Sequence, residues 1–295
     1  MRGHPRLLAS VITSLALTGQ IHAQRTRQTE TAPAIRDAAE AVRFDLYQGY
    51  CIVVHGSAGP LKNLNFIVDT GTNLTTFNSL IAKKLDLRDE APTDVVVVTG
   101  RERAENATLP WLKFGPVERF NLEINVADLS LFQKYLPVPI DAIIGLDVLG
   151  QRPFDIDYPA RVIRFGLTAV LPVTIPLRFD GGLAIFDAEI DHRLVHLLFD
   201  TGAPSLILYK TGNSPDSGVN NATGRGGDKL EEFKSTRVLL DSLKVGPEEF
   251  RHEPAVVAGN AKSSRLDFDG LMSPAALGIS RVSIDLRGGV LGFGR

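Results

Sequence analysis

The tripeptide Asp-Thr-Gly occurs twice in this chain, at residues 69–71 and at residues 200–202. Each copy follows an apolar run that is typical of a buried strand, at residues 66–68 and 197–199. Two carboxyls that lie close together cannot both ionise at ordinary pH, so they share one proton. Such a pair can act as general acid and general base on a single water molecule. The sequence therefore predicts that Asp69 and Asp200 meet face to face.

The flanks of the two tripeptides are repeated as well, which indicates a duplicated unit. Nearly half of the chain separates Asp69 from Asp200. Downstream, Asp141-Ala-Ile-Ile-Gly matches Asp269-Gly-Leu-Met-Ser at nearly the same spacing. Each copy closes on Phe-Gly, at residues 165–166 and again at 293–294. A repeat of this length is a domain-sized lobe rather than a solenoid unit.

Most segments between these landmarks are short apolar or alternating runs broken by Gly, Pro, Asn and Asp. This pattern is typical of strands and turns. Helical spacing is credible near residues 79–85 and 147–150. The sequence therefore predicts an all-β fold with minor helices. The strands expected from the pattern, besides those around the two tripeptides, are 94–99, 109–114, 120–126, 161–165, 236–240 and 254–258.

The first 23 residues are typical of an export signal. A basic start precedes an apolar core from Leu7 to Thr18, too short to span a bilayer, and Ala23 suits cleavage. We expect an exported protein, periplasmic or secreted, without stable membrane insertion; an uncleaved anchor is the alternative. The expected divisions are a signal peptide (1–23), a polar then weakly helical linker or short pro-segment (24–43), an N-terminal lobe (44–166), an interlobe connection (167–172) and a C-terminal lobe (173–295).

Composition limits the possible functions. With 44% apolar residues and a net charge of −2, the chain can bury a core and has no electrostatic reason to bind nucleic acid. Its only cysteine, Cys51, lies in an apolar run, which favours a small buried hydrophobe over a catalytic thiol. His192 and His196, beside Asp191, leave a metal site as a weak alternative. We expect no metal and no cofactor.

Two further patterns predict where side chains lie. Asp155 and Asp157 alternate with apolar residues, which indicates the solvated face of a strand. Trp111 is assigned to the core or to packing between the lobes.

The two Asp-Thr-Gly loops after apolar strands, together with Ile143-Ile144-Gly145 before a short helix, resemble aspartic peptidases, in particular the retropepsin-like branch. The resemblance covers about residues 44–295. One such lobe dimerises in the retroviral enzymes, and two diverged lobes are fused in pepsin-like enzymes. The resemblance implies a bilobal aspartic protease fold of two retropepsin-like β-barrel lobes. It also implies a monomer with pseudo-twofold lobes that cleaves a peptide or protein substrate in an interlobe cleft.

The resemblance also implies a role for each residue of the loops. The two aspartates would hold the attacking water and share its proton. Gly71 and Gly202 would let the backbone approach closely and aim N–H groups at the carboxylates. Thr70 and Thr201 would hydrogen-bond across to the opposite loop and lock the two lobes in register.

The residues that follow the two glycines differ, Thr72 in the first loop and Ala203 in the second. In this fold a hydroxyl at that position can hydrogen-bond the outer carboxylate oxygen and favour its charged form. We therefore expect Asp69 to be the more acidic member and Asp200 to carry the shared proton, although the two titrate as a pair.

A flap that closes over the substrate is expected between each aspartate and its later motif, at glycine-containing turns. Ordinary hairpin tips are the alternative. The second copy also has Ser273 where the first has Gly145, which allows lobe two to pack differently behind its aspartate. The flap candidates are Thr99, Gly100 and Arg101 in the first copy and Thr223, Gly224, Arg225 and Gly226 in the second.

The leading hypothesis is an exported, bilobal aspartic endopeptidase that works without metal or cofactor. One alternative is a peptide-binding protein that kept the fold but lost turnover, for which Ser273 is the main motive. Another is an envelope scaffold protein that uses the lobes structurally. Two intact, apposed carboxyls count against both alternatives, because burying such groups is costly and gives a binding site little advantage.

Overall fold

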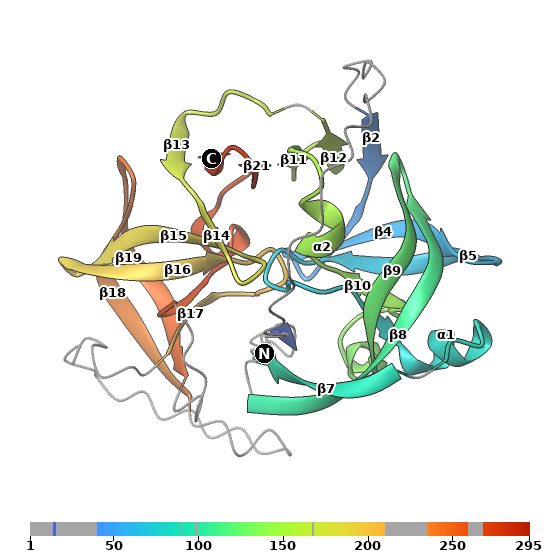
Figure 1. Cartoon of the computed structure of the whole chain (residues 1–295). Coiled ribbons are helices and arrows are strands. Elements are labelled where there is room, and N and C mark those ends of the chain that lie inside the picture. Colours follow the sequence, from blue (N-terminus) through green and yellow to red (C-terminus); the bar gives the residue numbers. More distant parts are fainter. Residues whose placement is uncertain are drawn as a thin grey trace, which may run out of the picture.

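The structure is a computed structural model that describes residues 14–15, 40–88, 90–97, 100–166, 168–209, 235–258 and 268–295. Two β-sheet lobes lie side by side, the N-terminal lobe in blue and green and the C-terminal lobe in yellow to red (Figure 1). Most elements are strands, and the helices are short. The predicted all-β, bilobal fold is confirmed.

A nine-stranded sheet forms the N-terminal lobe and curls until β8 also pairs with β4. Its strand order is β1-β7-β8-β9-β6-β10-β5-β4-β3. The strands are β1 (Ser14–Leu15), β3 (Asp45–Tyr47), β4 (Cys51–Ala58), β5 (Leu61–Val68), β6 (Thr76–Asn78), β7 (Glu90–Val97), β8 (Gly100–Phe114), β9 (Val117–Ala127) and β10 (Ala142–Ile144). The helices are α1 (Ser79–Lys84), the 3-10 helix η1 (Ser130–Lys134) and α2 (Leu146–Leu149), so both predicted helical segments are helical.

A seven-stranded sheet forms the C-terminal lobe, with β15 also pairing with β18. Its order is β14-β15-β16-β20-β17-β19-β18. The elements are β14 (Arg178–Asp180), β15 (Leu183–Ile190), β16 (Arg193–Phe199), β17 (Leu206–Tyr209), β18 (Ser235–Val245), β19 (Glu248–Ala258), β20 (Gly270–Met272) and the 3-10 helix η2 (Ala275–Leu277). In each lobe the strand before the Asp-Thr-Gly loop pairs in parallel with a later short strand, β5 with β10 and β16 with β20.

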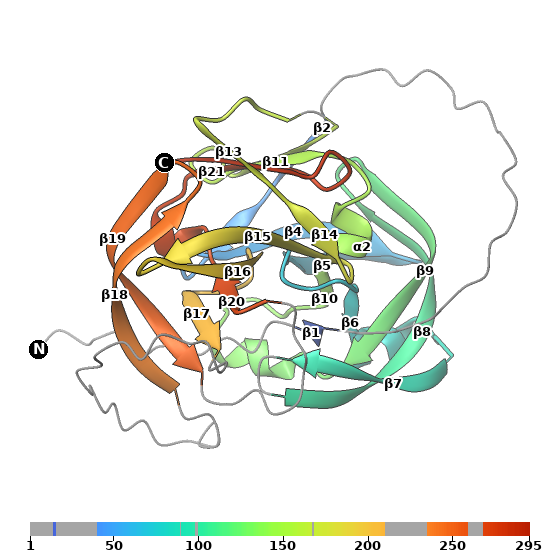
Figure 2. The same cartoon turned by 60° about the vertical axis from the view of Figure 1, so that its left-hand side comes forward.

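A six-stranded antiparallel sheet, at the top of Figure 1, joins the lobes. Its order is β13-β22-β21-β11-β12-β2. The central pairing joins β11 of the first repeat to β21 of the second, so each repeat supplies half of the sheet. The strands are β2 (Glu40–Arg43), β11 (Phe154–Asp157), β12 (Val162–Phe165), β13 (Val173–Pro176), β21 (Arg281–Asp285) and β22 (Val290–Gly294). Figure 2 shows this sheet spanning both lobes from another side.

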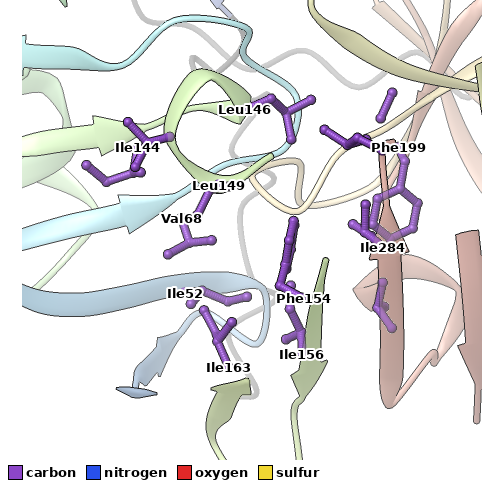
Figure 3. Packing of buried hydrophobic residues seen from close by; sticks show 14 of the residues in the cluster. Ile52, Val68, Ile144, Leu146, Leu149, Phe154, Ile156, Ile163, Phe199 and Ile284 are labelled. Atoms are coloured by element: carbon purple, nitrogen blue, oxygen red, sulfur yellow. The ribbon is translucent and has the colours of Figure 1, made fainter. Parts of the chain in front are cut away.

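The main hydrophobic core extends through both lobes, and part of it lies between this joining sheet and the strands that lead to the two aspartates. Val68 and Phe199, which immediately precede the aspartates, are fully buried in it together with Phe154 of β11 (Figure 3). Because side chains alternate along a strand, the aspartates face away from this core.

On that opposite face each lobe has a separate, smaller apolar cluster. The cluster of the N-terminal lobe includes Ile67 and Ile143, and the cluster of the C-terminal lobe includes Leu198 and Leu271. Ile67 and Leu198 each lie two residues before an aspartate. The carboxyl pair therefore shares its strand faces with two apolar surfaces, one from each lobe.

Three sequence-based expectations are wrong. Residues 40–43, the end of the segment expected to be polar and then weakly helical, form strand β2, which pairs with β12. Asp157 is 7% exposed rather than solvated, because β11 is an inner strand of the joining sheet; its carboxylate lies 3.3 Å from Arg281 of the other repeat. Trp111 is only half-buried, and its Nε1–H donates to Glu118 at 2.8 Å across the β8–β9 hairpin.

Several expectations concern residues outside the described part of the chain. Residues 1–13 and 16–39, which hold most of the expected signal peptide and linker, are among them. Within the described segments, no helix combines the length and apolar character needed to cross a membrane.

Candidate active site

Backbone hydrogen bonds at the end of each parallel strand pair hold the two aspartates at equivalent positions. The Asp69 N–H donates to the Ile144 carbonyl at 3.1 Å, and the Asp200 N–H donates to the Met272 carbonyl at 3.0 Å. Both aspartate side chains are 0% exposed. Each repeat thus delivers one buried carboxyl to the end of a strand at the junction of the lobes.

A second pair of repeated acids, whose role sequence reasoning missed, fastens these strands. Asp141 Oδ2 accepts the Asn65 N–H, and Asp269 Oδ2 accepts the His196 N–H, each at 2.8 Å. The N–H of each acid donates back to the carbonyl of the same partner, at 2.9 and 2.7 Å. The sequence shows that these two acids occupy equivalent positions in the repeat. In the structure their hydrogen bonds join the later short strand to the strand that carries the active-site aspartate.

Thr70 and Thr201 connect the two loops through four hydrogen bonds. The Thr70 N–H donates to Thr201 Oγ1 at 3.1 Å, and the Thr201 N–H donates to Thr70 Oγ1 at 3.0 Å. The Thr70 hydroxyl donates to the Phe199 carbonyl at 2.8 Å, and the Thr201 hydroxyl donates to the Val68 carbonyl at 3.1 Å. Each hydroxyl therefore accepts from the opposite loop and donates to it, which holds the repeats in register.

Gly71 and Gly202 are required by the close approach of the opposite carboxyl. A Cβ at Gly71 would lie 2.6 Å from Asp200 Oδ1, and a Cβ at Gly202 would lie 2.7 Å from Asp69 Cγ. Both distances are well inside normal van der Waals separation. The N–H of each glycine donates to the aspartate of its own loop at 2.8 Å. The structure therefore brings the two carboxyls together across the loops.

The environment of Asp69 favours its protonated form. Complete burial raises the pKa of the Asp69 carboxyl well above its ordinary value, and the nearby charge of Asp200 and a hydrogen bond between the two carboxyls raise it further. The Gly71 N–H acts in the opposite direction. The pair therefore holds one shared proton where two isolated carboxyls would hold none.

The raised pKa of Asp69 runs against the expectation that Thr72 makes Asp69 the more acidic member. The Thr72 hydroxyl donates to the backbone carbonyl two residues later at 3.1 Å, and Asp69 Oδ2 accepts no N–H or hydroxyl group from the described residues. Asp69 Oδ1 accepts the Gly71 N–H at 2.8 Å, and Asp200 Oδ1 accepts the N–H groups of Gly202 and Ala203 at 2.8 and 3.1 Å. Hydrogen bonds to a charged carboxylate stabilise it, whereas the fully buried Asp69 Oδ2 has no such donor, which favours a proton on Asp69.

A further, partly buried carboxylate, Asp147 of α2, supports the first loop from behind. It accepts the Thr75 N–H at 3.1 Å, the Thr75 hydroxyl at 2.8 Å and the Val148 N–H at 3.0 Å. Burial raises the pKa of Asp147 to about 6, although these hydrogen bonds oppose the rise. The equivalent position in the second repeat is Ala275, so comparing the two repeats could not identify Asp147 as a supporting residue.

The two lobes differ behind their aspartates, as the replacement of Gly145 by Ser273 allowed. Gly145 precedes the four-residue α-helix α2, whereas Ser273 and Pro274 precede the three-residue 3-10 helix η2. In the second repeat Ala275 stands in place of Asp147, so the helix behind the second loop supplies no matching carboxylate.

Replacing Asp147 with Asn is expected to reduce the pH dependence of stability between about pH 4 and 6. The pKa of Asp147 is raised from 3.8 to about 6, so the folded chain binds this proton more tightly than the unfolded chain does. Stability from the protonated group is therefore lost as the pH rises through about 6, by roughly 3 kcal/mol in all. Urea unfolding of both proteins across this range measures the effect. A difference in the free energy of unfolding that stays constant with pH would contradict it.

The alternative site residues do not form a second reactive centre. Burial, followed by the charge of the nearby aspartate, raises the pKa of the Cys51 thiol to about 12, so it remains neutral. His196 pairs with Asp187 at 2.7 Å, and His192 lies 3.4 Å from Glu189. Across the described segments, no group of three or more His, Cys, Asp or Glu side chains could hold a metal ion.

The flap candidates are only partly described. Gly100 and Arg101 begin β8, where they pair with Val97 and Val96 of β7, so this candidate stands at the tip of the β7–β8 hairpin. Thr99 and the second candidate, residues 223–226, lie outside the described residues. Flap function stays a prediction.

Comparisons with known proteins agree with this geometry. A model of the aspartyl protease family matches residues 52–148, which include Asp69. The crystal structure of conglutin gamma, a unique basic 7S globulin from lupine seeds, is 14% identical and covers 88% of this chain and 95% of its own, with a TM-score of 0.50. Basic 7S globulin from soybean is also 14% identical and covers 87% of this chain and 94% of its own, with a TM-score of 0.49. No curated protein matches the chain.

These observations define the class of protein. The chain has an aspartic peptidase-like fold, with one Asp-Thr-Gly loop from each of two duplicated lobes. At 14% identity, the likeness to the lupine globulin shows the fold alone.

Proposed function

We propose that the chain is an exported aspartic endopeptidase that hydrolyses peptide bonds with a water molecule activated by Asp69 and Asp200. The proposal rests on one observation: two fully buried carboxyls face each other across loops joined by reciprocal threonine bonds. The family match over residues 52–148 supports it for the first loop. The basic and apolar N-terminal pattern that ends at Ala23 supports export.

The two carboxyls have different roles in the proposed reaction. Asp200, charged at the start, takes a proton from water as the water oxygen attacks the scissile carbonyl carbon. Asp69 donates its proton to the carbonyl oxygen, which forms a neutral gem-diol. Asp69 then takes a proton from the gem-diol while Asp200 donates its proton to the leaving nitrogen. The C–N bond breaks, and both carboxyls return to their starting states without a metal or cofactor.

The direct test is peptide cleavage by the purified exported protein, whose N-terminus is expected at Gln24. A mixed peptide library is incubated with the protein from about pH 3 to 7, with and without a transition-state-mimicking aspartic protease inhibitor. We expect cleavage that the inhibitor blocks and that declines as the pair loses its shared proton at higher pH. Peptide binding without cleavage at every pH would instead support a binding protein that has lost turnover. Neither binding nor cleavage would support a scaffold.

A further inference from the structure

A row of register partners crosses the face of the N-terminal sheet that carries Asp69. Each residue in the row is paired with the next on a neighbouring strand, so all five side chains lie on one face. Ile67 of this row lies two residues before Asp69 and therefore shares its strand face. The row, from β4 through β5, β10 and β6 to β9, is Val53, Ile67, Ile143, Thr76 and Asn125.

The second lobe contains the same row, and there it is entirely apolar. Thr76 corresponds to Ile207 and Asn125 corresponds to Val256, both at the spacing that separates the two aspartates. The two polar residues are therefore a departure of the first lobe from a shared apolar pattern. The second row is Ile185, Leu198, Leu271, Ile207 and Val256.

The polar side-chain atoms of Thr76 and Asn125 are buried without hydrogen-bond partners. Thr76 is 2% exposed and Asn125 is 1% exposed. Thr76 Oγ1 and both Asn125 Oδ1 and Nδ2 lack a hydrogen-bond partner in the described structure. Buried polar groups are nearly always hydrogen-bonded, because leaving them unpaired is costly. Two adjacent side chains with three such atoms therefore call for a partner from outside the folded chain.

A neighbouring asparagine on the same face has both polar atoms of its side-chain amide hydrogen-bonded within the fold. Asn78 lies two residues after Thr76 on β6 and is 5% exposed. Its Oδ1 accepts the Leu80 N–H at 3.0 Å, and its Nδ2 donates to the Ile140 carbonyl at 3.1 Å. Asn78 thus caps helix α1, whereas Asn125 has no comparable structural bond.

We propose that Thr76 and Asn125 form a specificity site that binds a carboxamide side chain, Asn or Gln, of the peptide substrate. The inference rests on the proposed function. A second carboxamide offers a donor and an acceptor that pair with those of Asn125 in two hydrogen bonds, and the Thr76 hydroxyl can either donate or accept. A charged side chain fits poorly, because the rest of the row is apolar and supplies no countercharge.

Sheet geometry places this site near the scissile bond. Thr76 and Asn125 lie two and three strands away from β5, or about 10 and 15 Å at normal strand spacing. An extended peptide advances about 3.3 Å per residue, so the selected side chain lies within about four residues of the bond that is cleaved. Thr76 and Asn125 are as buried as Asp69 and Asp200, so substrate entry must expose the row together with the carboxyl pair.

The first experiment compares cleavage-site profiles of the wild type, Asn125→Val and Thr76→Val on one peptide library, read by mass spectrometry. Asn125→Val copies the second lobe's Val256. We expect the wild type to favour Asn or Gln at one subsite by about tenfold or more, since a site built to hydrogen-bond its ligand rejects analogues that lack those bonds. Either variant should lose this preference and favour apolar side chains there.

Thermal unfolding separates a binding role from a structural one. Removing an unpaired buried polar group should leave the Tm of Asn125→Val unchanged or raised. The matched control is Asn78→Val, which removes a bonded amide at a helix N-cap and should lower the Tm by about 5 °C. A comparable fall in Asn125→Val would show that Asn125 is satisfied within the folded chain and would overturn the inference.

The outcomes distinguish this inference from the proposed function. Cleavage without a carboxamide preference, or a preference that survives both substitutions, overturns the inference alone. If the wild type cleaves no peptide, the proposed function fails. A peptide-binding experiment then tests the inference about Thr76 and Asn125. The library is then captured on immobilised Asp200→Asn protein with and without Asn125→Val. Enrichment of Asn or Gln peptides that the second substitution abolishes supports the site, and no enrichment overturns it.

Discussion

Replacing Asp69 or Asp200 with Asn is expected to lower kcat for peptide cleavage by about 10³-fold or more. Each carboxyl both takes and gives a proton during one turnover, and a carboxamide can do neither at the pH of the reaction. The two substitutions should have similar effects, because the acid and the base act as a unit. Initial rates on a peptide found in the library screen, at saturating concentration, measure the loss.

The fold should survive these substitutions, so the loss can be assigned to chemistry. Both side chains are fully buried, and Asn has the shape of Asp. Removing one of two apposed carboxyls also relieves the repulsion that raises the pKa of Asp69, so stability near neutral pH should rise. Asp187→Asn, which changes an exposed carboxylate of β15, is the matched control. Activity of either active-site variant within tenfold of the wild type would refute the proposed mechanism.

Replacing Thr70 or Thr201 with Val is expected to lower the free energy of unfolding by about 2–5 kcal/mol. Each hydroxyl donates one buried hydrogen bond and accepts another across the loops. Its removal leaves a buried N–H and a buried carbonyl unpaired, at roughly 1–3 kcal/mol each. The Tm should fall by roughly 10 °C, as measured by calorimetry or circular dichroism.

Matched serine variants test whether the hydroxyls or the methyl groups matter. Thr70→Ser and Thr201→Ser keep the hydroxyl and should lose much less stability than the valine variants. Because the two residues bond directly to each other, a double-mutant cycle should show coupling of about 1 kcal/mol or more. If the losses in unfolding free energy of the two valine variants are strictly additive, or if the serine variants lose as much stability as the valine variants, the four hydrogen bonds do not couple the two loops.

Local sequence was sufficient to predict the fold class and the pairing of the two aspartates. Strand patterning and turn residues act over a few positions, so the runs before Asp69 and Asp200 predicted strands on their own. Because two copies of one repeated unit fold alike, the strands predicted around one aspartate also indicated how the other aspartate is placed. The same logic marked Asp141 and Asp269 as equivalent, and helical spacing identified both α1 and α2.

What depends on contacts between distant segments could not be predicted. Asp157 has the alternation of a solvated strand face, yet the pairing of β11 with β21 buries it beside Arg281. Thr72 has a hydroxyl in a suitable position, but that hydroxyl donates to a nearby backbone carbonyl, and burial raises the pKa of Asp69. A pKa depends on burial and on every neighbouring charge, which sequence does not specify.

Sequence patterns alone predict two similar lobes that each present an Asp-Thr-Gly loop after a buried strand, because these features arise from short-range patterns copied by duplication. The surroundings of each carboxyl and the side chains that share their face follow instead from how distant strands pair. Thr76 and Asn125 are distant in the chain and become neighbours only through the parallel pairing of β6 with β9. Strand register is set by the packing of the whole sheet, so this polar pair could not be recognised before the fold was known.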